Sequence, residues 1–114
     1  MKVSYEGIGA LYATFSCGAL TEGVPVRVSA AGSVSACSKG NEIAGVAAAV
    51  SRGKDACSVQ LRGFVTLPYS GETAPTVGYC ALAADGKGAV AKAATGGRSL
   101  LAVSVENGTV TVLL

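Results

Sequence analysis

The four cysteines of this chain, Cys17, Cys37, Cys57 and Cys80, are its most reactive side chains. A structural zinc site needs two close pairs of thiolates, because a tight turn must aim two ligands at one ion. No two of these cysteines are close in sequence, and histidine, the other common zinc ligand, is absent. We therefore expect no metal site. We interpret the cysteines as small buried residues, with disulfides across neighbouring strands as the alternative.

Nucleophilic catalysis requires a base beside the nucleophile, and without histidine the base must be lysine or a carboxylate. Ser38-Lys39 and Lys54-Asp55 bring such groups together, but both pairs lie in polar turns, where charges are normally solvated. No glycine pattern of a nucleophile elbow surrounds Ser70, and Lys87 is followed by glycine where a phosphate loop has serine or threonine. The sequence therefore predicts a protein that is not an enzyme and holds no cofactor.

Composition argues against two further classes of function. Charged residues make up 14% of the chain, the net charge is +2, and no basic run is present. Aromatic residues make up 5% and tryptophan is absent, so we expect no binding to nucleic acid. No apolar stretch is long enough to span a membrane, and Glu6, Gly7 and Gly9 interrupt the start of the chain where a signal peptide is apolar. We therefore expect no membrane contact, no export and reduced cysteines.

Alternation of apolar and polar residues dominates the rest of the chain and is typical of half-buried strands. It is clearest at Val24, Val26 and Val28, and Gly63 interrupts a longer run in a way that predicts a bulge or a bend between sheets. The segment 43–50 suits a buried strand or a helix, and a short helix within 75–84 or 89–94 is a further alternative. The predicted strands are 24–29, 43–50, 56–67, 77–83, 98–106 and 109–114.

The strongest local signal is Asn107-Gly108, the preferred pair for a two-residue type I′ hairpin turn. A regular ladder from this turn places three apolar pairs on one face and Ser104 opposite Thr111 on the other. The three predicted pairs are Val105 with Val110, Val103 with Val112, and Leu101 with Leu114.

Two stretches of the chain, 24–61 and 77–114, follow a similar plan. Each opens with a predicted strand, passes a glycine turn, reaches an Ala/Val segment and closes with a strand after a polar turn. Two interpretations are open: a duplicated unit, or the general likeness of Ala/Val-rich strands.

Residues 1–23 lack clean periodicity and mix aromatic residues with glycines. An extended arm that docks aromatic anchors on a partner has this composition, which makes Tyr5, Tyr12 and Phe15 candidate contact residues. The alternative is an ordinary first strand at Leu11–Cys17. We accordingly divide the chain into 1–23, an arm or first strand, and 24–114, a single β domain.

The order of these segments resembles the small capsid cement, or head decoration, proteins of tailed bacteriophages. The family pattern is an "I/V-x-G-V-A" strand, a "V-x-L-x-G-x-x-x-L-P" strand, a "G-x-x-V/C-x" strand and a closing hairpin. The resemblance covers about Val24 to Leu114. The matching segments are Ile43–Val50, Val59–Pro68, Gly78–Leu82, Leu100–Val103 and Val110–Leu113.

The resemblance implies a compact β-barrel or β-sandwich. Together with the alternation and the turn at Asn107-Gly108, it gives the predicted fold: all-β, with a C-terminal hairpin and an N-terminal arm. It implies binding of the phage major capsid protein on the outer surface of the assembled head, after assembly in the host cytoplasm, as a homo-oligomer that we expect to be a trimer. The alternatives are another phage structural β-module, from a tail, fibre or baseplate, or a β-barrel that binds a small ligand or a carbohydrate. Tyr69 and Tyr79 are the candidates for stacking on a sugar.

Overall fold

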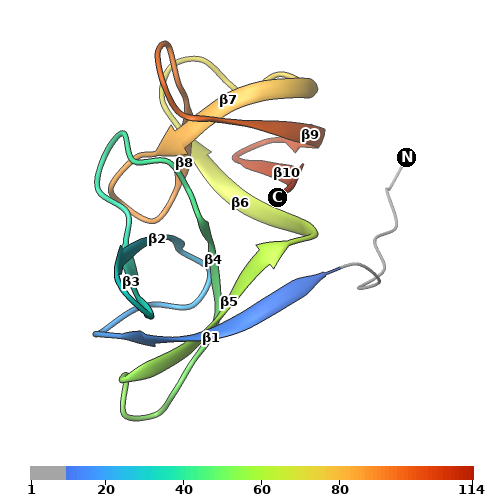
Figure 1. Ribbon diagram of the computed structural model, residues 1–114. Helices are drawn as coiled ribbons and strands as arrows, with labels where there is room; N and C mark the ends of the chain where they lie inside the picture. The colour runs from blue at the N-terminus through green and yellow to red at the C-terminus, as the bar shows by residue number, and fades with distance from the viewer. Residues whose placement is uncertain (1–9) are drawn as a thin grey trace.

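The computed structural model describes residues 10–114, and these residues form an all-β structure without helices. No helix that could span a membrane is therefore found in this part of the chain. Ten strands build two closed five-stranded barrels, which lie next to each other in Figure 1. The prediction of an all-β barrel is confirmed.

The first barrel uses the first half of the described chain. Its strands follow the order β1-β3-β2-β4-β5, and β1 closes the barrel by pairing antiparallel with β5 and parallel with β3. Its interior is filled by small and medium side chains, among them Val26, Val34 and Val59. The strands are β1 (Leu11–Cys17), β2 (Pro25–Ala30), β3 (Ser33–Ala36), β4 (Gly45–Val50) and β5 (Ala56–Arg62).

The second barrel uses the second half, in the order β10-β6-β8-β7-β9. Here β6 pairs antiparallel with β10 and parallel with β8. Leu67, Leu82, Val90 and Val110 are among the side chains that fill it. The strands are β6 (Phe64–Ser70), β7 (Gly78–Ala84), β8 (Val90–Lys92), β9 (Arg98–Glu106) and β10 (Thr109–Leu113).

The two barrels have the same topology, strand for strand. In each, the first strand pairs parallel with the third and antiparallel with the fifth, and the second pairs with the third and the fourth. The fourth and fifth strands form an antiparallel pair with a bulge in both barrels. The structure therefore favours the duplicated unit over a general likeness of sequence, and extends it to β1 and β6.

The observed strands differ from the predicted ones in two ways: one predicted strand is split, and two short strands are additional. Gly63, with a φ of 110°, ends β5 and turns the chain into β6, so the predicted strand 56–67 is two strands in two barrels. The predicted set lacks the short strands β3 and β8, because four and three residues give too short a run for alternation to be recognised. The segment after Ile43 forms a strand, and no helix occurs in 75–84 or 89–94.

The C-terminal hairpin forms at Asn107-Gly108, as predicted, but its ladder is not regular. Val105 pairs with Val110 and Ser104 with Thr111, after which a bulge at Val103 shifts the register. The predicted pairs Val103 with Val112 and Leu101 with Leu114 are wrong: Ala102 pairs with Val112, and Leu101 with Leu113. The extra residue turns Ala102, which is fully buried, toward the core in place of Val103.

The two barrels share a hydrophobic core at their junction. Ile43 and Val46, from the β3–β4 connection and β4, belong to the same buried cluster as the interior of the second barrel. The Arg98 guanidinium donates a hydrogen bond to the Ile43 carbonyl over 3.1 Å. The side-chain amide of Gln60 donates to the carbonyls of Arg62, at 3.2 Å, and Phe64, at 3.0 Å, across the Gly63 turn.

Candidate interaction surface

The most prominent surface feature is a line of large apolar side chains across the outer wall of the second barrel. Phe64 on β6 pairs with Leu113 on β10, Leu113 pairs with Leu101 on β9, and Leu101 pairs with Tyr79 on β7. We call these four residues the apolar row. Because directly opposed residues project from the same face of a sheet, the four side chains lie side by side on four adjacent strands.

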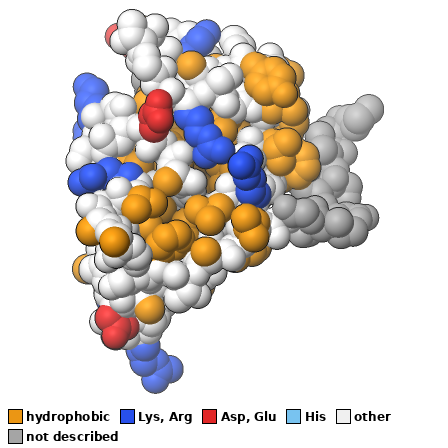
Figure 2. Space-filling model, in the orientation of Figure 1, with side chains coloured by type: hydrophobic (Ala, Val, Ile, Leu, Met, Phe, Trp, Pro, Cys, Tyr) orange, Lys and Arg blue, Asp and Glu red, His pale blue; other side chains and the backbone are white. Residues whose placement is uncertain are grey.

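The apolar row is exposed to different degrees. Tyr79 is 78% exposed, Phe64 39% and Leu113 37%, while Leu101 is half-buried between its neighbours. In Figure 2, hydrophobic side chains gather at the right-hand edge of the second barrel, over the strands labelled β7, β9 and β10 in Figure 1. Contiguous apolar surface of this kind marks interaction sites on proteins more often than a single exposed leucine does.

Sequence reasoning missed three of the four members of the row. The signal was present as adjacent apolar pairs, Leu100-Leu101 and Leu113-Leu114, because consecutive apolar residues in a strand point to opposite faces. Leu100 and Leu114 are buried in the core, and the residue beside each one therefore faces outward. Tyr79 was considered only as a sugar-stacking residue, and its partner in that hypothesis, Tyr69, packs against the core.

The structure separates the three contact residues predicted from the sequence. Tyr12 is 51% exposed on β1, beside Leu11 at 53%, so both present apolar surface to solvent. Phe15 is half-buried and packs against the interior of the first barrel. Tyr5 lies outside the described residues. The segment Leu11–Cys17 forms strand β1, which pairs with β5 along its length. This strand is the alternative to an extended arm given in the sequence analysis.

Ser70, which the sequence analysis considered as a nucleophile, takes part in a turn held by Asp85. Ser70 donates a hydrogen bond to Asp85 over 2.8 Å, and the other carboxylate oxygen of Asp85 accepts from the backbone amides of Lys87, at 2.7 Å, and Ala89, at 3.0 Å. Burial opposes ionisation of Asp85, but these hydrogen bonds outweigh it and lower the pKa of the carboxyl. Asp85 therefore holds the β7–β8 turn as an anion, and its lowered pKa makes it a weak base toward Ser70.

All four cysteines are free thiols, and Cys37, Cys57 and Cys80 are buried. Burial and contact with the Cys17 thiol raise the pKa of Cys57 to about 11, and burial raises the pKa of Cys37 despite the nearby charge of Arg27. A raised pKa keeps the thiol protonated and unreactive at neutral pH. Among residues 10–114, no cluster of cysteine and carboxylate side chains is arranged to hold a metal ion.

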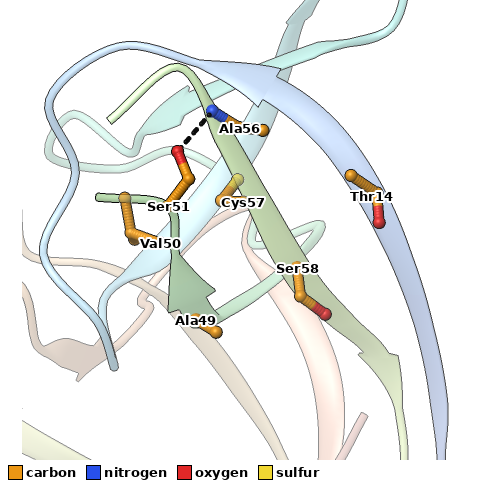
Figure 3. A pocket seen from close by; sticks show the side chains of 7 residues that line it. All are labelled: Thr14, Ala49, Val50, Ser51, Ala56, Cys57 and Ser58. Atoms are coloured by element: carbon orange, nitrogen blue, oxygen red, sulfur yellow. Dashed lines mark hydrogen bonds between the residues drawn. The ribbon is translucent and has the colours of Figure 1, made fainter. Parts of the chain in front are cut away.

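A shallow depression lies on the first barrel (Figure 3). Thr14, Ser58 and Ala49 line it as neighbours on β1, β5 and β4. At one end the Ser51 hydroxyl accepts a hydrogen bond from the Ala56 amide over 3.2 Å and donates one to Asp55 over 2.8 Å. The lining side chains are small and uncharged.

Neither a protein-family model nor a curated protein sequence matches the chain. The case for a function therefore depends on the surface just described and on the resemblance stated above.

Proposed function

We propose that this protein is a capsid decoration protein that binds the outside of an assembled phage head and strengthens contacts between capsid subunits. The observation that carries the proposal is the exposed apolar surface of Tyr12 and the apolar row on a small, closed barrel fold. An adhesive protein needs such a surface and needs no catalytic group.

The chemistry of the described residues supports a binding role over a catalytic one. The Cys37 and Cys57 thiols, whose pKa values are raised, remain protonated at neutral pH. The Asp85 carboxylate accepts hydrogen bonds from the backbone of the β7–β8 turn. Tyr12 and Tyr79 are the exposed groups best suited to recognition, because aromatic residues are enriched in the buried centres of protein interfaces. The partner in this proposal is the major capsid protein, and the protein acts as a trimer on the virion surface.

Within this proposal, Tyr12 is the exposed member of the predicted capsid contact among the described residues. It is half-exposed, so its ring has free area to bury against a partner, at about 25 cal/mol per Å² of apolar surface. Phe15 contributes indirectly by holding β1 on its barrel.

Co-sedimentation with particles assembled from the cognate major capsid protein tests the proposal. We expect the wild-type protein to pellet with the particles in a fixed ratio and Tyr12→Ala to bind at least tenfold more weakly. Val28→Ala is the matched control, because Val28 is also about half exposed, at 54%, but lies on β2. Failure of the wild-type protein to bind would contradict the proposed function, and equal binding by Tyr12→Ala would remove Tyr12 from the contact.

A further inference from the structure

Two of the four cysteines lie on neighbouring strands of the first barrel. Cys17 is the last residue of β1, and Cys57 lies on β5, the strand that closes the barrel against β1. Phe15 pairs with Cys57, and the Cys17 amide donates to the Asp55 carbonyl over 3.1 Å. The two cysteines are therefore diagonal neighbours on one face of the sheet, and both side chains belong to the packing inside this barrel.

The two thiols are in contact, and this contact adds to the effect of burial on the pKa of Cys57. The thiols of Cys37 and Cys80 each face a backbone carbonyl instead, at 3.9 Å. In the second barrel, the equivalent strands β6 and β10 place Tyr69 and Val110 in the core. The fold itself therefore does not require two cysteines where its first and fifth strands meet.

We propose that Cys17 and Cys57 form a reversible disulfide in the folded protein when it meets a disulfide oxidant such as oxidised glutathione. The bond would join β1 covalently to β5 and hold the first barrel closed. It forms in the free protein, so it does not depend on the proposed function.

The reaction consists of two thiol–disulfide exchanges. Cys17, which is the half-buried member of the pair, reacts first: its thiolate attacks one sulfur of oxidised glutathione, forms a mixed disulfide and releases one glutathione. The Cys57 thiol then loses its proton, attacks the Cys17 sulfur and releases the second glutathione. The two cysteines give up two electrons and two protons, which end on the two glutathione thiols. Because the pKa of Cys57 is raised to about 11, the second exchange needs alkaline solution.

The bond requires a small movement of the end of β1 toward β5. Cα atoms of diagonal neighbours are about 7–8 Å apart, whereas those of a disulfide are roughly 4.4–6.8 Å apart. Cys17 can make this movement because it ends its strand, and the next residue, Gly18, has no atom within 4 Å of an added Cβ. A disulfide that closes against such a shift is more easily reduced than an unstrained one, which makes it reversible.

Oxidation of the folded protein by oxidised glutathione at pH 9 tests the proposal, with thiol titration in denaturant and peptide mapping by mass spectrometry. We expect the titratable thiols of the wild type to fall from four to two, and the map to show one peptide pair joined through Cys17 and Cys57. The midpoint of urea denaturation should rise, because the link restricts the unfolded chain, and should return after reduction with dithiothreitol.

Two variants make the test specific. Cys17→Ser should keep its three remaining thiols under the same treatment. The matched variant with Cys37→Ser and Cys80→Ser keeps the proposed pair and should lose both of its thiols.

The proposal is overturned by a wild-type protein that keeps four thiols, by glutathione that stays on Cys17 without closing the bond, or by a disulfide that joins two chains. A link that forms equally in Cys17→Ser would also overturn it.

Discussion

At the scale of single residues, Gly45 shows how closely the first barrel is packed. A Cβ atom built on Gly45 would lie 2.5 Å from the Gln60 carbonyl oxygen and 2.7 Å from a methyl carbon of Val59. Backbone cannot move aside as a flexible side-chain end does, so Gly45→Ala should lower the free energy of unfolding by about 1–3 kcal/mol. Urea denaturation measures this loss.

Gly18→Ala is the matched control for Gly45→Ala. Gly18 has no atom within 4 Å of an added Cβ and does not have a positive φ. A loss of stability at Gly18 as large as that at Gly45 would contradict the steric argument. The sequence contains both glycines but does not distinguish them, because the clash at Gly45 comes from residues distant in sequence.

Asp85 provides a pH-dependent prediction at the same scale. Its carboxylate accepts three hydrogen bonds, and its pKa is lowered in the folded protein. A group whose folded pKa is lowered stabilises the fold above its unfolded pKa, here 3.8, and loses that contribution as pH falls through the folded pKa. Asp85→Ala should therefore cost about 1 kcal/mol at pH 7 and much less near pH 2.

Thermal denaturation of wild type and Asp85→Ala at the two pH values measures the difference. Asp55→Ala is a suitable comparison, since Asp55 is exposed and accepts one side-chain hydrogen bond, from Ser51. A cost for Asp85→Ala that is the same at pH 2 and pH 7 would show that the charge of Asp85 does not stabilise the turn.

At the scale of elements, the turns at Gly63 and Gly108 both need glycine, but for different reasons. Gly108, with φ 89°, has open space around an added Cβ, so Gly108→Ala should cost about 1 kcal/mol from backbone strain alone. Gly63, with φ 110°, has the Gln60 amide nitrogen at 3.0 Å and the Ala10 Cα at 3.1 Å from an added Cβ. Gly63→Ala should cost more, about 2–3 kcal/mol, because strain and crowding combine.

Urea denaturation midpoints of the two variants give the comparison directly. Equal losses at Gly63 and Gly108 would mean that the Gln60 side chain and Ala10 adjust freely. The sequence predicted both turns, since Asn-Gly is a strong hairpin signal and Gly63 interrupts an alternating strand. It did not predict the bulge at Val103. Whether Ala102 or Val103 points into the core depends on the packing of the closed barrel, which involves strands distant in sequence.

At the scale of the whole molecule, the shared cluster at the junction makes the two barrels one unit of stability. Ile43 comes from the first half of the chain but is buried, at 1% exposure, among side chains of the second barrel. Ile43→Ala should lower stability by about 2–4 kcal/mol and do so for both barrels together. Hydrogen exchange of the backbone amides, followed strand by strand, measures each barrel separately.

The expected result for Ile43→Ala is an equal loss of protection in β1–β5 and β6–β10. A loss confined to one barrel would contradict the single unit. The sequence predicted the all-β class from its alternation, but not the division into two barrels. Closure depends on β3 and β8, which have four and three residues and pair with strands far away in sequence.

Cryo-electron microscopy tests the proposed decoration of a capsid most directly, on particles assembled from the cognate major capsid protein with and without added protein. We expect additional density on the outer surface, repeated wherever capsid subunits meet in the same way and large enough for three copies of the barrel pair. Particles that look the same with and without saturating protein would contradict it.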